Sequence, residues 1–318
     1  MVIIIPALNE EATIAEVIQR CQNVPLPEVC SREVVVVDDG STDETASIAR
    51  GLGAIEVSHP VNRGVGLAFQ SGLRKALELG ATLIVNIDAD GQFNPDNIPS
   101  LLQPIFSDKA DFTTASRFKD PELIPVMPGI KIWGNRVMSR LICKISRQKF
   151  YDVSCGFRAY SREAALQLNL WGEFTYTQES ILDLVVKGMR LVEVPMKIRG
   201  VRSAGKSRVA SNLFKYGYRA AIIILNTYRD FWPMYFFGWI SLMCFLPGVS
   251  LVVFLLIHYV VKGSFSPHLW AGFTGGALVF LALVTLITGV MAQMLKRIRL
   301  NQEMMLFYHK SRHYSDAD

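Results

Sequence analysis

Two carboxylates, Asp88 and Asp90, stand two residues apart at the end of an apolar run, in the stretch NIDADGQF of residues 86 to 93. If the run is a strand that continues this far, both side chains leave the same face of it. Like charges held so close repel, so a positive partner is expected beside them. Magnesium and manganese prefer oxygen ligands, often one or two carboxylates together with substrate phosphates. We therefore expect Asp88, Asp90 and Gln92 to hold Mg²⁺ or Mn²⁺; the alternative is a solvated acidic turn.

A second acidic pair, Asp38 and Asp39, follows another apolar run in VVDDGSTDE. The residues from Ser41 to Glu44 have the pattern of a capping box, which opens a helix. Such a helix start does not need the two preceding acids, and two more carboxylates at a strand end raise the electrostatic energy. The pair is therefore expected to serve a ligand.

The elements that must position these acids alternate between strand and helix over residues 1 to 200. Asn9 is expected to cap the first helix, with Glu10 and Glu11 in its first turn. The predicted strands are 2–5, 33–37, 54–58, 81–87 and 110–116, and further helices start near 41, at 64 and after Pro95. Strands that are apolar throughout and separated by helices indicate an α/β fold with a mostly parallel sheet covered on both faces.

Ligands of such sheets bind at the carboxyl ends of the strands. The polar residues just past the predicted strand ends should therefore meet at one edge; they are Asn9, Asp38, Asp39, Asp88, Asp90 and Arg117. A G-x-G also occurs in NRGVGLAFQSG (62–72), but Phe69 stands where the third glycine of a dinucleotide fingerprint would be. This motif indicates close packing of a helix start rather than NAD binding.

Two later motifs carry basic residues. DVSCGFRAYSREA (152–164) places Asp152 and Arg158 around a glycine, and RSAGKSR (202–208) sets three cations around a glycine and two serines. Arg202 and Arg208 are suited to hold phosphate. The alternative for both motifs is an ordinary solvated loop.

Two long apolar stretches follow. No Asp, Glu, Lys or Arg occurs between Asp230 and Lys262, or between Lys262 and Lys296. Each gap exceeds the roughly 20 residues that a helix needs to cross the hydrocarbon core of a bilayer. We expect transmembrane helices at 232–261 and 267–295 and a tail at 296–318. The alternative is two buried helices of a large soluble core.

Charge around these spans predicts their orientation. Basic residues flank the outer ends of both spans: Lys215, Arg219, Arg229, Lys296, Arg297 and Arg299. The positive-inside rule then places residues 1–205 and both termini in the cytoplasm, in a two-span protein of the cell membrane. Residues 206–231 carry a polar stripe at helical spacing, which predicts an amphipathic juxtamembrane helix.

The overall charge of +5 is modest, and the basic residues gather toward the predicted membrane. This distribution favours anionic lipid or phosphate as a partner and speaks against nucleic acid. The five cysteines show neither a CxxC pair nor zinc spacing, so we expect reduced thiols in a cytosolic setting. They are Cys21, Cys30, Cys143, Cys155 and Cys244.

Seven motifs occur in order along residues 1 to 210: PALNEE, VVDDGSTDET, NRGVGLAFQSGLRKALELG, NIDADGQF, SRF, DVSCGFRAYSREA and RSAGKSR. Together they resemble family 2 of the glycosyltransferases, and more narrowly the dolichol-phosphate mannose synthase and polyprenyl-phosphate glycosyltransferase group. The two-helix tail is similar to that of bacterial polyprenyl-phosphate glucosyl- and aminoarabinosyl-transferases. The resemblance implies a GT-A fold for residues 1–205.

The resemblance also implies residue roles. Contacts to the donor nucleotide would fall on Pro6, Leu8, Glu10, Val37 and Asp39. The diphosphate and metal region would lie at Asp88, Ala89, Asp90 and Gln92. Phosphates would be held by Arg117, Arg202 and Arg208, and aligned by Lys131 and Arg136. The expected catalytic residues are Asp88, Asp90 and Arg117. Arg208 departs from the mannose synthases, which usually carry Lys there.

The implied reaction is inverting transfer of a hexose from a nucleoside-diphosphate sugar, of the GDP-mannose or UDP-glucose type, to dolichyl or undecaprenyl phosphate at the cytoplasmic membrane face. A phosphate acceptor is largely dianionic at pH 7 and needs no strong general base. Glu179 is open to two interpretations, a base or a structural acid. The alternative functions are a processive polysaccharide synthase of the same family, although no Arg-Trp pair occurs in the chain, and a non-catalytic nucleotide-sugar-binding membrane protein. A homo-oligomer is left open.

Overall fold

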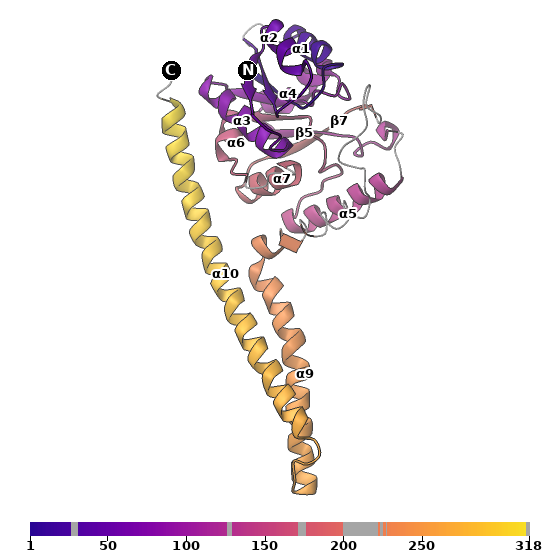
Figure 1. The fold of residues 1–318 in the computed structure, drawn as a ribbon, viewed down its shortest axis with the longest axis vertical. Coiled ribbons are helices and arrows are strands. Elements are labelled where there is room, and N and C mark those ends of the chain that lie inside the picture. The colour runs from indigo at the N-terminus through magenta and orange to yellow at the C-terminus, as the bar shows by residue number, and fades with distance from the viewer. Residues whose placement is uncertain are drawn as a thin grey trace. The chain divides into compact units, whose positions relative to one another are not determined.

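The computed structural model describes residues 1–26, 31–125, 129–170, 176–199, 222, 225–226 and 228–315 (Figure 1). The chain divides into two compact units. The first comprises Met1–Ser211 together with Met305–Asp318, and the second comprises Asn212–Met304. Most of the predicted juxtamembrane helix at 206–231 lies outside the described residues.

A seven-stranded sheet forms the centre of the first unit, in the order β3-β2-β1-β4-β6-β5-β7. The strands are β1 (Val2–Ala7), β2 (Glu33–Asp38), β3 (Ile55–Ser58), β4 (Leu83–Asn86), β5 (Phe112–Ser116), β6 (Arg158–Ser161) and β7 (Leu191–Pro195). All neighbours pair in parallel except β6, which runs antiparallel to both β4 and β5. The predicted α/β fold with a mostly parallel sheet is confirmed.

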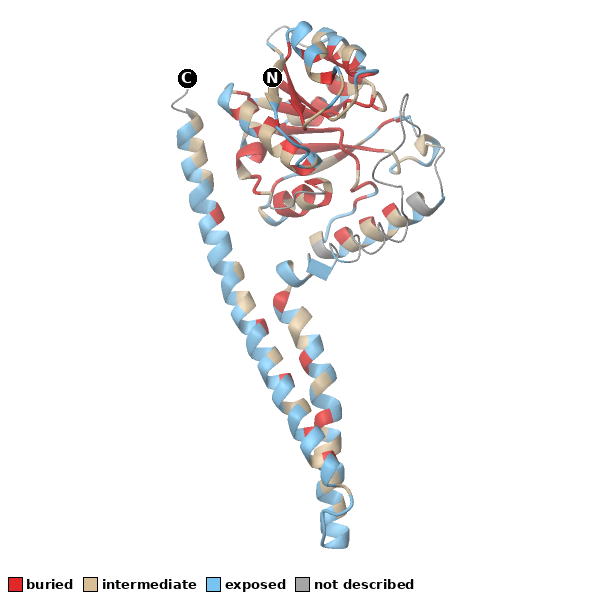
Figure 2. Ribbon diagram, viewed as in Figure 1, coloured by how far each residue is buried: buried red, intermediate tan, exposed pale blue. Residues whose placement is uncertain are grey.

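Helices bury the sheet between them, and Figure 2 shows its strands as buried. The helices of this unit are α1 (Ile14–Asn23), α2 (Thr45–Gly51), α3 (Val65–Glu78), α4 (Ile98–Phe106), α5 (Gly129–Ser146), α6 (Arg162–Gln167) and α7 (Tyr176–Val186), with short 3-10 turns η1 (Pro95–Asn97) and η2 (Pro121–Leu123). α3 lies against β1 and β2, and a Cβ on its Gly72 would come within 2.3 Å of the Ile4 side chain. Only glycine permits this close approach of helix to sheet.

Two predicted helix starts are wrong in detail. α1 begins at Ile14 rather than directly after Asn9, whose backbone is left-handed with φ of 50°. The Asn9 side chain accepts a hydrogen bond from the Thr42 amide at 2.7 Å. Ser41 likewise accepts from the Asn9 amide at 2.9 Å rather than capping α2, which begins at Thr45. These short polar side chains join two loops across the sheet edge, an alternative to capping that Ser and Asn readily adopt.

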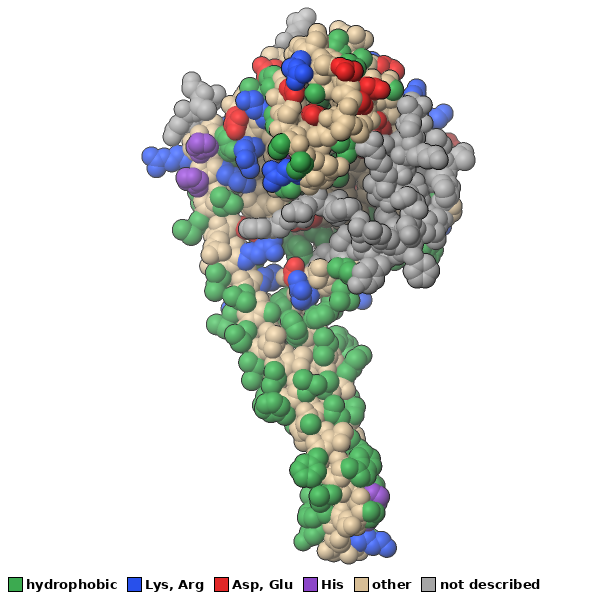
Figure 3. Space-filling model, in the orientation of Figure 1, with side chains coloured by type: hydrophobic (Ala, Val, Ile, Leu, Met, Phe, Trp, Pro, Cys, Tyr) green, Lys and Arg blue, Asp and Glu red, His purple; other side chains and the backbone are tan. Residues whose placement is uncertain are grey.

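The second unit contains α9 (Pro233–Lys262) and most of α10 (Leu269–Ser315). Both helices are long and apolar enough to cross a membrane, with mean hydropathy of 2.6 and 2.3 over their most apolar windows. Only 11% of each window is buried, so neither helix is enclosed by the described part of this chain as a core helix would be. Figure 2 shows most residues of both helices as exposed or intermediate, and Figure 3 shows hydrophobic side chains along this part of the chain. Residues 296–315, predicted as a separate tail, continue α10 as the same helix.

Within this unit, α9 and α10 touch through glycines. A Cβ on Gly275 would come within 2.8 Å of the Gly248 carbonyl oxygen and 2.9 Å of the Val252 side chain. The neighbouring Gly276 would meet no atom within 4 Å. Close backbone approach through small residues is the usual basis of helix pairing in a bilayer.

We expect Gly275→Val to destabilise the hairpin by about 1–3 kcal/mol, the usual cost of overpacking a tight contact. Gly276→Val is the matched control, because it adds the same β-branched side chain to the same helix one residue away. Thermal unfolding in detergent should show a lower Tm for the first variant only. Equal Tm values for the two variants would contradict this packing.

Candidate active site

The carboxyl ends of β1, β2 and β4 lie at one edge of the sheet because these strands are parallel and adjacent. Antiparallel β6 begins at the same edge, where Arg158 pairs with Asn86 at the end of β4 and with Thr114 near the end of β5. The segment 152–157, which precedes β6, therefore lies at the same edge of the sheet as Asp88 and Asp90, which follow β4. Sequence reasoning did not foresee this reversed strand, and no local pattern marks it.

The two acids lie in the loop after β4, which ends at Asn86, so the strand does not continue to Asp90 as supposed. Asp90 is buried, and its Oδ1 accepts a hydrogen bond from the Gln92 amide at 3.0 Å. Asp88 is half-buried. Both of its carboxylate oxygens lie 3.0 Å from the position that a Cβ on Gly156 would take. The absence of a side chain at residue 156 thus makes room for the Asp88 carboxylate.

Arg117, which was expected at the same edge of the sheet, supplies positive charge near the two acids. Burial alone would lower the pKa of this guanidinium, but Asp152 and, more weakly, Asp88 hold it above its ordinary value. Arg117 follows β5 and Asp88 follows β4, and only the folded sheet brings them together. Electrostatic repulsion at Asp88 is therefore offset in part by the protein itself.

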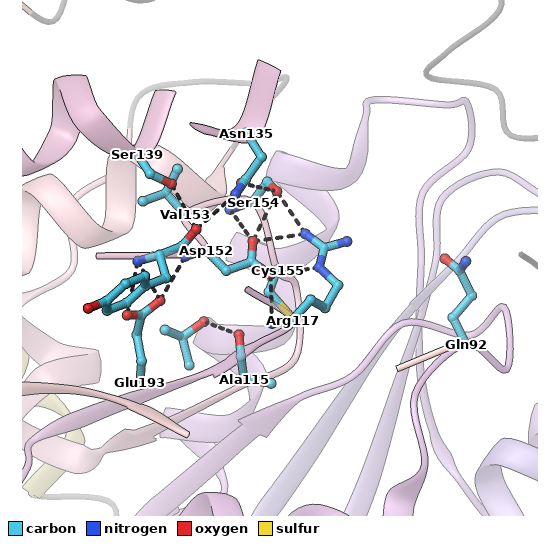
Figure 4. A network of polar contacts seen from close by, with 12 residues as sticks. Gln92, Ala115, Arg117, Asn135, Ser139, Asp152, Val153, Ser154, Cys155 and Glu193 are labelled. Carbon is cyan, nitrogen blue, oxygen red and sulfur yellow. Dashed lines mark hydrogen bonds and ion pairs between the residues drawn. The ribbon is translucent and has the colours of Figure 1, made fainter. Parts of the chain in front are cut away.

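Asp152 fixes the Arg117 side chain from one side (Figure 4). Its carboxylate accepts from Arg117 Nε at 2.6 Å, from Nη2 at 2.8 Å and from the Arg117 amide at 3.1 Å. Ser154 Oγ also accepts from Nη2 at 2.8 Å. Asp152 is fully buried, and the Arg117 side chain is 19% exposed. Among the described residues none bonds to Nη1, which points away from Asp152 in Figure 4.

The floor of the site is a buried polar layer. Asn86 Nδ2 donates to the Gly156 carbonyl at 2.8 Å and to Tyr176 Oη at 2.9 Å. Arg158 is fully buried and donates to the Cys155 carbonyl at 2.7 Å and to Ser180 Oγ at 2.6 Å. The segment from Asp152 to Arg158 is thus an interior element, which excludes the solvated-loop interpretation for it.

The residues expected at the nucleotide are placed around the ends of β1 and β2. Pro6 and Val37 are buried and pair with each other across the two strands, whereas Leu8 and Glu10 are half-buried. Asp39 is buried, and hydrogen bonds already engage both of its oxygens. Oδ1 accepts from the Arg63 amide and lies 2.7 Å from His59 Nδ1, and Oδ2 accepts from the Gly64 amide.

The remaining predicted basic residues are described unevenly. Arg136 is exposed on α5, while the side chain of Lys131 lies outside the described part of the structure, as do Arg202 and Arg208. Arg199, shortly before the basic motif, is joined to the acidic loop. Its amide donates to the Gln92 carbonyl at 3.2 Å, and Gln92 Nε2 donates to the Arg199 carbonyl at 3.3 Å.

The oxygen groups of this loop fit a hard divalent cation. Within the described residues, no cluster of three or more His, Cys, Asp or Glu is arranged to hold a metal. Asp88 and Asp90 offer two carboxylates, and Ala89 between them is buried. Mg²⁺ characteristically binds one or two protein carboxylates and completes its shell with water and substrate phosphates. The donor set therefore suits a cation that is bound together with a phosphorylated ligand.

A family model described as Glycosyl transferase family 2 matches residues 2–168, more than half of the chain. The chain belongs to glycosyl transferase family 2. This glycosyltransferase is 34% identical over 215 residues to UDP-N-acetylglucosamine–dolichyl-phosphate N-acetylglucosaminyltransferase of Methanococcus voltae, covering 61% of this chain and 84% of the relative. It is 28% identical over 231 residues to polyprenol monophosphomannose synthase of Mycolicibacterium smegmatis, covering 67% and 84%. Glycosyltransferase AglJ of Haloferax volcanii is 27% identical over 310 residues and covers 95% of both chains.

Solved structures share the fold of this glycosyltransferase. Glucosyl-3-phosphoglycerate synthase from Mycobacterium tuberculosis, in complex with Mn²⁺, UDP and glucosyl-3-phosphoglycerate, superposes with a TM-score of 0.54 and 25% identity over 71% of this chain and 78% of that one. Its complex with Mg²⁺ and UDP gives a TM-score of 0.53 at 23% identity, over 71% and 77%. The expected family and GT-A fold are confirmed, and the protein is an enzyme.

Gly156→Ala tests whether the position of the Asp88 carboxylate against Gly156 matters for transfer. The added methyl group would lie 3.0 Å from both Asp88 oxygens and 3.2 Å from Tyr176 Oη, so the carboxylate must shift. We expect transfer to fall about tenfold, because small displacements at a reacting centre are costly. Gly51→Ala, where the Cβ meets no atom within 4 Å, is the control and should keep full activity. Unchanged activity in Gly156→Ala would show that the position of Asp88 is not critical.

Proposed function

We propose that this glycosyltransferase moves a hexose, with inversion, from a nucleoside-diphosphate sugar of the GDP-mannose or UDP-glucose type to a polyprenyl phosphate. The observation that carries the proposal is Arg117, a half-buried guanidinium that Asp152 holds on one side beside the acidic loop. Such an arginine can meet phosphate oxygens with its remaining N–H groups. The relatives from Methanococcus voltae and Mycolicibacterium smegmatis are named for dolichyl phosphate and polyprenol monophosphate chemistry, which supports a lipid phosphate acceptor.

The proposed reaction depends on stabilising the charge of the leaving diphosphate and on aligning the acceptor phosphate more than on proton transfer. Asp90 and Gln92, with Asp88 close by, would hold a divalent ion, which would supply positive charge beside the leaving diphosphate. The acceptor phosphate is largely dianionic at pH 7 and attacks the anomeric carbon directly. Arg117 orients that phosphate in line with the departing diphosphate, and such positioning accounts for a large part of a rate enhancement.

The basic motif at 202–208 is proposed to complete the phosphate site. Arg199 is bonded at both its amide and its carbonyl to Gln92 of the acidic loop. The chain leading to Arg202 and Arg208 therefore departs from beside that loop, which supports a phosphate role for both. Lys131 and Arg136 are proposed to align the acceptor.

The decisive experiment incubates purified protein with a panel of radiolabelled GDP- and UDP-sugars, undecaprenyl phosphate and Mg²⁺ or Mn²⁺. We expect label in the lipid phase as a single-sugar product with one class of donor. Label in polymer would indicate a processive synthase instead. Donor binding without transfer to any acceptor would indicate a non-catalytic binding protein.

We further propose that α9 and α10 cross the membrane as a hairpin, with residues 1–205 and both termini in the cytoplasm. Lys262 is the only Asp, Glu, Lys or Arg between Asp230 and Lys296, and basic residues cluster outside both ends of this stretch. The positive-inside rule places such basic ends in the cytoplasm. In intact cells, an impermeant thiol reagent should label a cysteine introduced by Ser264→Cys and should not label one introduced by Ser315→Cys. The reverse pattern would overturn this orientation.

A further inference from the structure

Glu193 on β7 is a buried carboxylate that the reaction described above does not use. It is 6% exposed, and among the described residues no Lys or Arg forms an ion pair with it. Burial raises the pKa of this acid, and the nearby charge of Asp152 raises it further, against the lowering effect of hydrogen bonds from backbone amides. A second buried acid near Asp152 is unfavourable for the stability of the fold unless its hydrogen bonds compensate or serve the function.

The backbone amides that donate hydrogen bonds to the Glu193 carboxylate all belong to the segment that carries Asp152. The Glu193 carboxylate accepts from the Tyr151 amide at 3.0 and 3.1 Å and from the Asp152 amide at 2.8 Å. The other side of the same peptide is also held, since the Tyr151 carbonyl accepts from Asn135 Nδ2 at 2.8 Å and from Ser139 Oγ at 3.1 Å. The backbone at residues 151–152 is therefore clamped between β7 and α5, as Figure 4 shows.

The fixed backbone at residues 151–152 also fixes the side chain of Arg117, because Asp152 binds it. Asp152 forms two parallel bonds, to Nε and Nη2, at 2.6 and 2.8 Å, and a fixed backbone at residue 152 keeps its carboxylate in the position that both bonds need. With those two nitrogens held, the direction of Nη1 is determined. A planar guanidinium fork loses little freedom per bond once it is oriented in this way.

We infer that Glu193 is a positioning residue of the transfer reaction, acting through the Tyr151–Asp152 backbone and the Asp152 carboxylate to aim Arg117 at the phosphate of the acceptor. This inference rests on the proposed role of Arg117. Glu193 touches neither substrate nor metal in this scheme. Its effect is on the alignment of the phosphate and reaches the reaction only through the guanidinium.

The test is a cycle of variants assayed for kcat/KM toward undecaprenyl phosphate, with the donor that gives product in the panel assay. Glu193→Gln keeps one acceptor oxygen and removes the charge. It should lower kcat/KM by about 10- to 100-fold, the usual effect of removing a group that orients a functional residue. The same change in an Arg117→Met/Asp152→Asn background should have no further effect, because the route from Glu193 to the phosphate is already broken.

A matched control separates positioning from general support of the fold. Asp183 is also a buried carboxylate that accepts a backbone hydrogen bond, from the Asn169 amide at 3.0 Å. Unlike Glu193 it forms an ion pair with Lys187 at 2.8 Å, so its neutralisation tests a loss of stability that is not accompanied by a loss of positioning. Asp183→Asn should leave kcat/KM within about twofold of the parent, since a surviving hydrogen-bond acceptor limits the loss. UDP or GDP binding with Mn²⁺, measured by calorimetry, should be the same in Glu193→Gln as in the parent.

The outcomes distinguish this inference from the proposed function. An equal loss from Glu193→Gln in both backgrounds would overturn the positioning role while leaving the role of Arg117 intact. Normal transfer by the Arg117→Met/Asp152→Asn protein would overturn both. A loss confined to the parent background supports the inference.

Discussion

Asp90→Asn should reduce sugar transfer at least about 100-fold, as the loss of one preorganised electrostatic contact at a reacting centre commonly does. The substitution preserves size, and an amide oxygen can still accept the hydrogen bond that the Gln92 amide donates to Asp90 Oδ1 at 3.0 Å. The turn after β4 should therefore survive, and only the charge is lost. Initial rates with saturating donor and acceptor measure the effect.

Removal of the divalent metal should also block sugar transfer. In the parent protein, EDTA should stop transfer, and Mg²⁺ or Mn²⁺ should restore it. Circular dichroism and thermal unfolding of Asp90→Asn should match those of the parent. A normal rate for Asp90→Asn in EDTA would show that Asp88 and Asp90 form a solvated turn and that the mechanism proposed here is wrong.

Substitutions in the Arg117–Asp152 pair should also have a large effect on transfer, and a second substitution should restore stability without restoring activity. Arg117→Met leaves the fully buried Asp152 without its cation, and breaking one side of a buried pair typically costs about 3–5 kcal/mol. Adding Asp152→Asn removes the stranded charge and should recover most of that free energy of unfolding. Transfer should remain at least about 100-fold below the parent in both variants, because neither presents a guanidinium to phosphate.

Denaturant unfolding in detergent and the transfer assay together check this expectation. Asp111 and Arg190 form an exposed ion pair at 2.8 Å, and neutralising it with Asp111→Asn is the control. That change should leave transfer unaffected and shift stability by no more than about 1 kcal/mol. If the Arg117→Met/Asp152→Asn protein recovered activity along with stability, Arg117 would be a structural residue only.

Apolar runs predicted most of the sheet because burial on both faces leaves a strong local signal. β1, β2 and β4 appear where runs of apolar residues occur, whereas β5 contains two threonines and a serine; the polar residues after these strands do lie at one edge. The antiparallel course of β6 left no such signal, since strand direction is a property of pairing between distant segments. The same limit explains why Asn9 and Ser41 were assigned to helix caps: their partners lie across two loops, 32 residues apart in the chain.

The candidate site was predictable in its residue types but not in its connections. Asp88, Asp90 and Arg117 stood out because acids and cations at strand ends need an explanation. That Arg117 is locked to Asp152, 35 residues later, and that Asp88 rests against Gly156, depends on the register of β6 between β4 and β5. Glu193 gave no sign in the sequence, because one acid in a short strand resembles any solvent-facing residue.

The strand order divides the sheet into two contiguous blocks. β3, β2, β1 and β4 come from the first 86 residues of the chain, and β6, β5 and β7 come from residues 112–195. The acidic loop belongs to the first block, and the arginine with its two supporting acids belongs to the second. The two blocks meet where β4 pairs with β6 and Asn86 lies opposite Arg158, and they also meet through the acidic loop, where Gln92 is hydrogen-bonded to Arg199. Under the proposed roles the first block holds the donor and the second orients the acceptor phosphate, so a change of acceptor chemistry in the second block must preserve these contacts with the first.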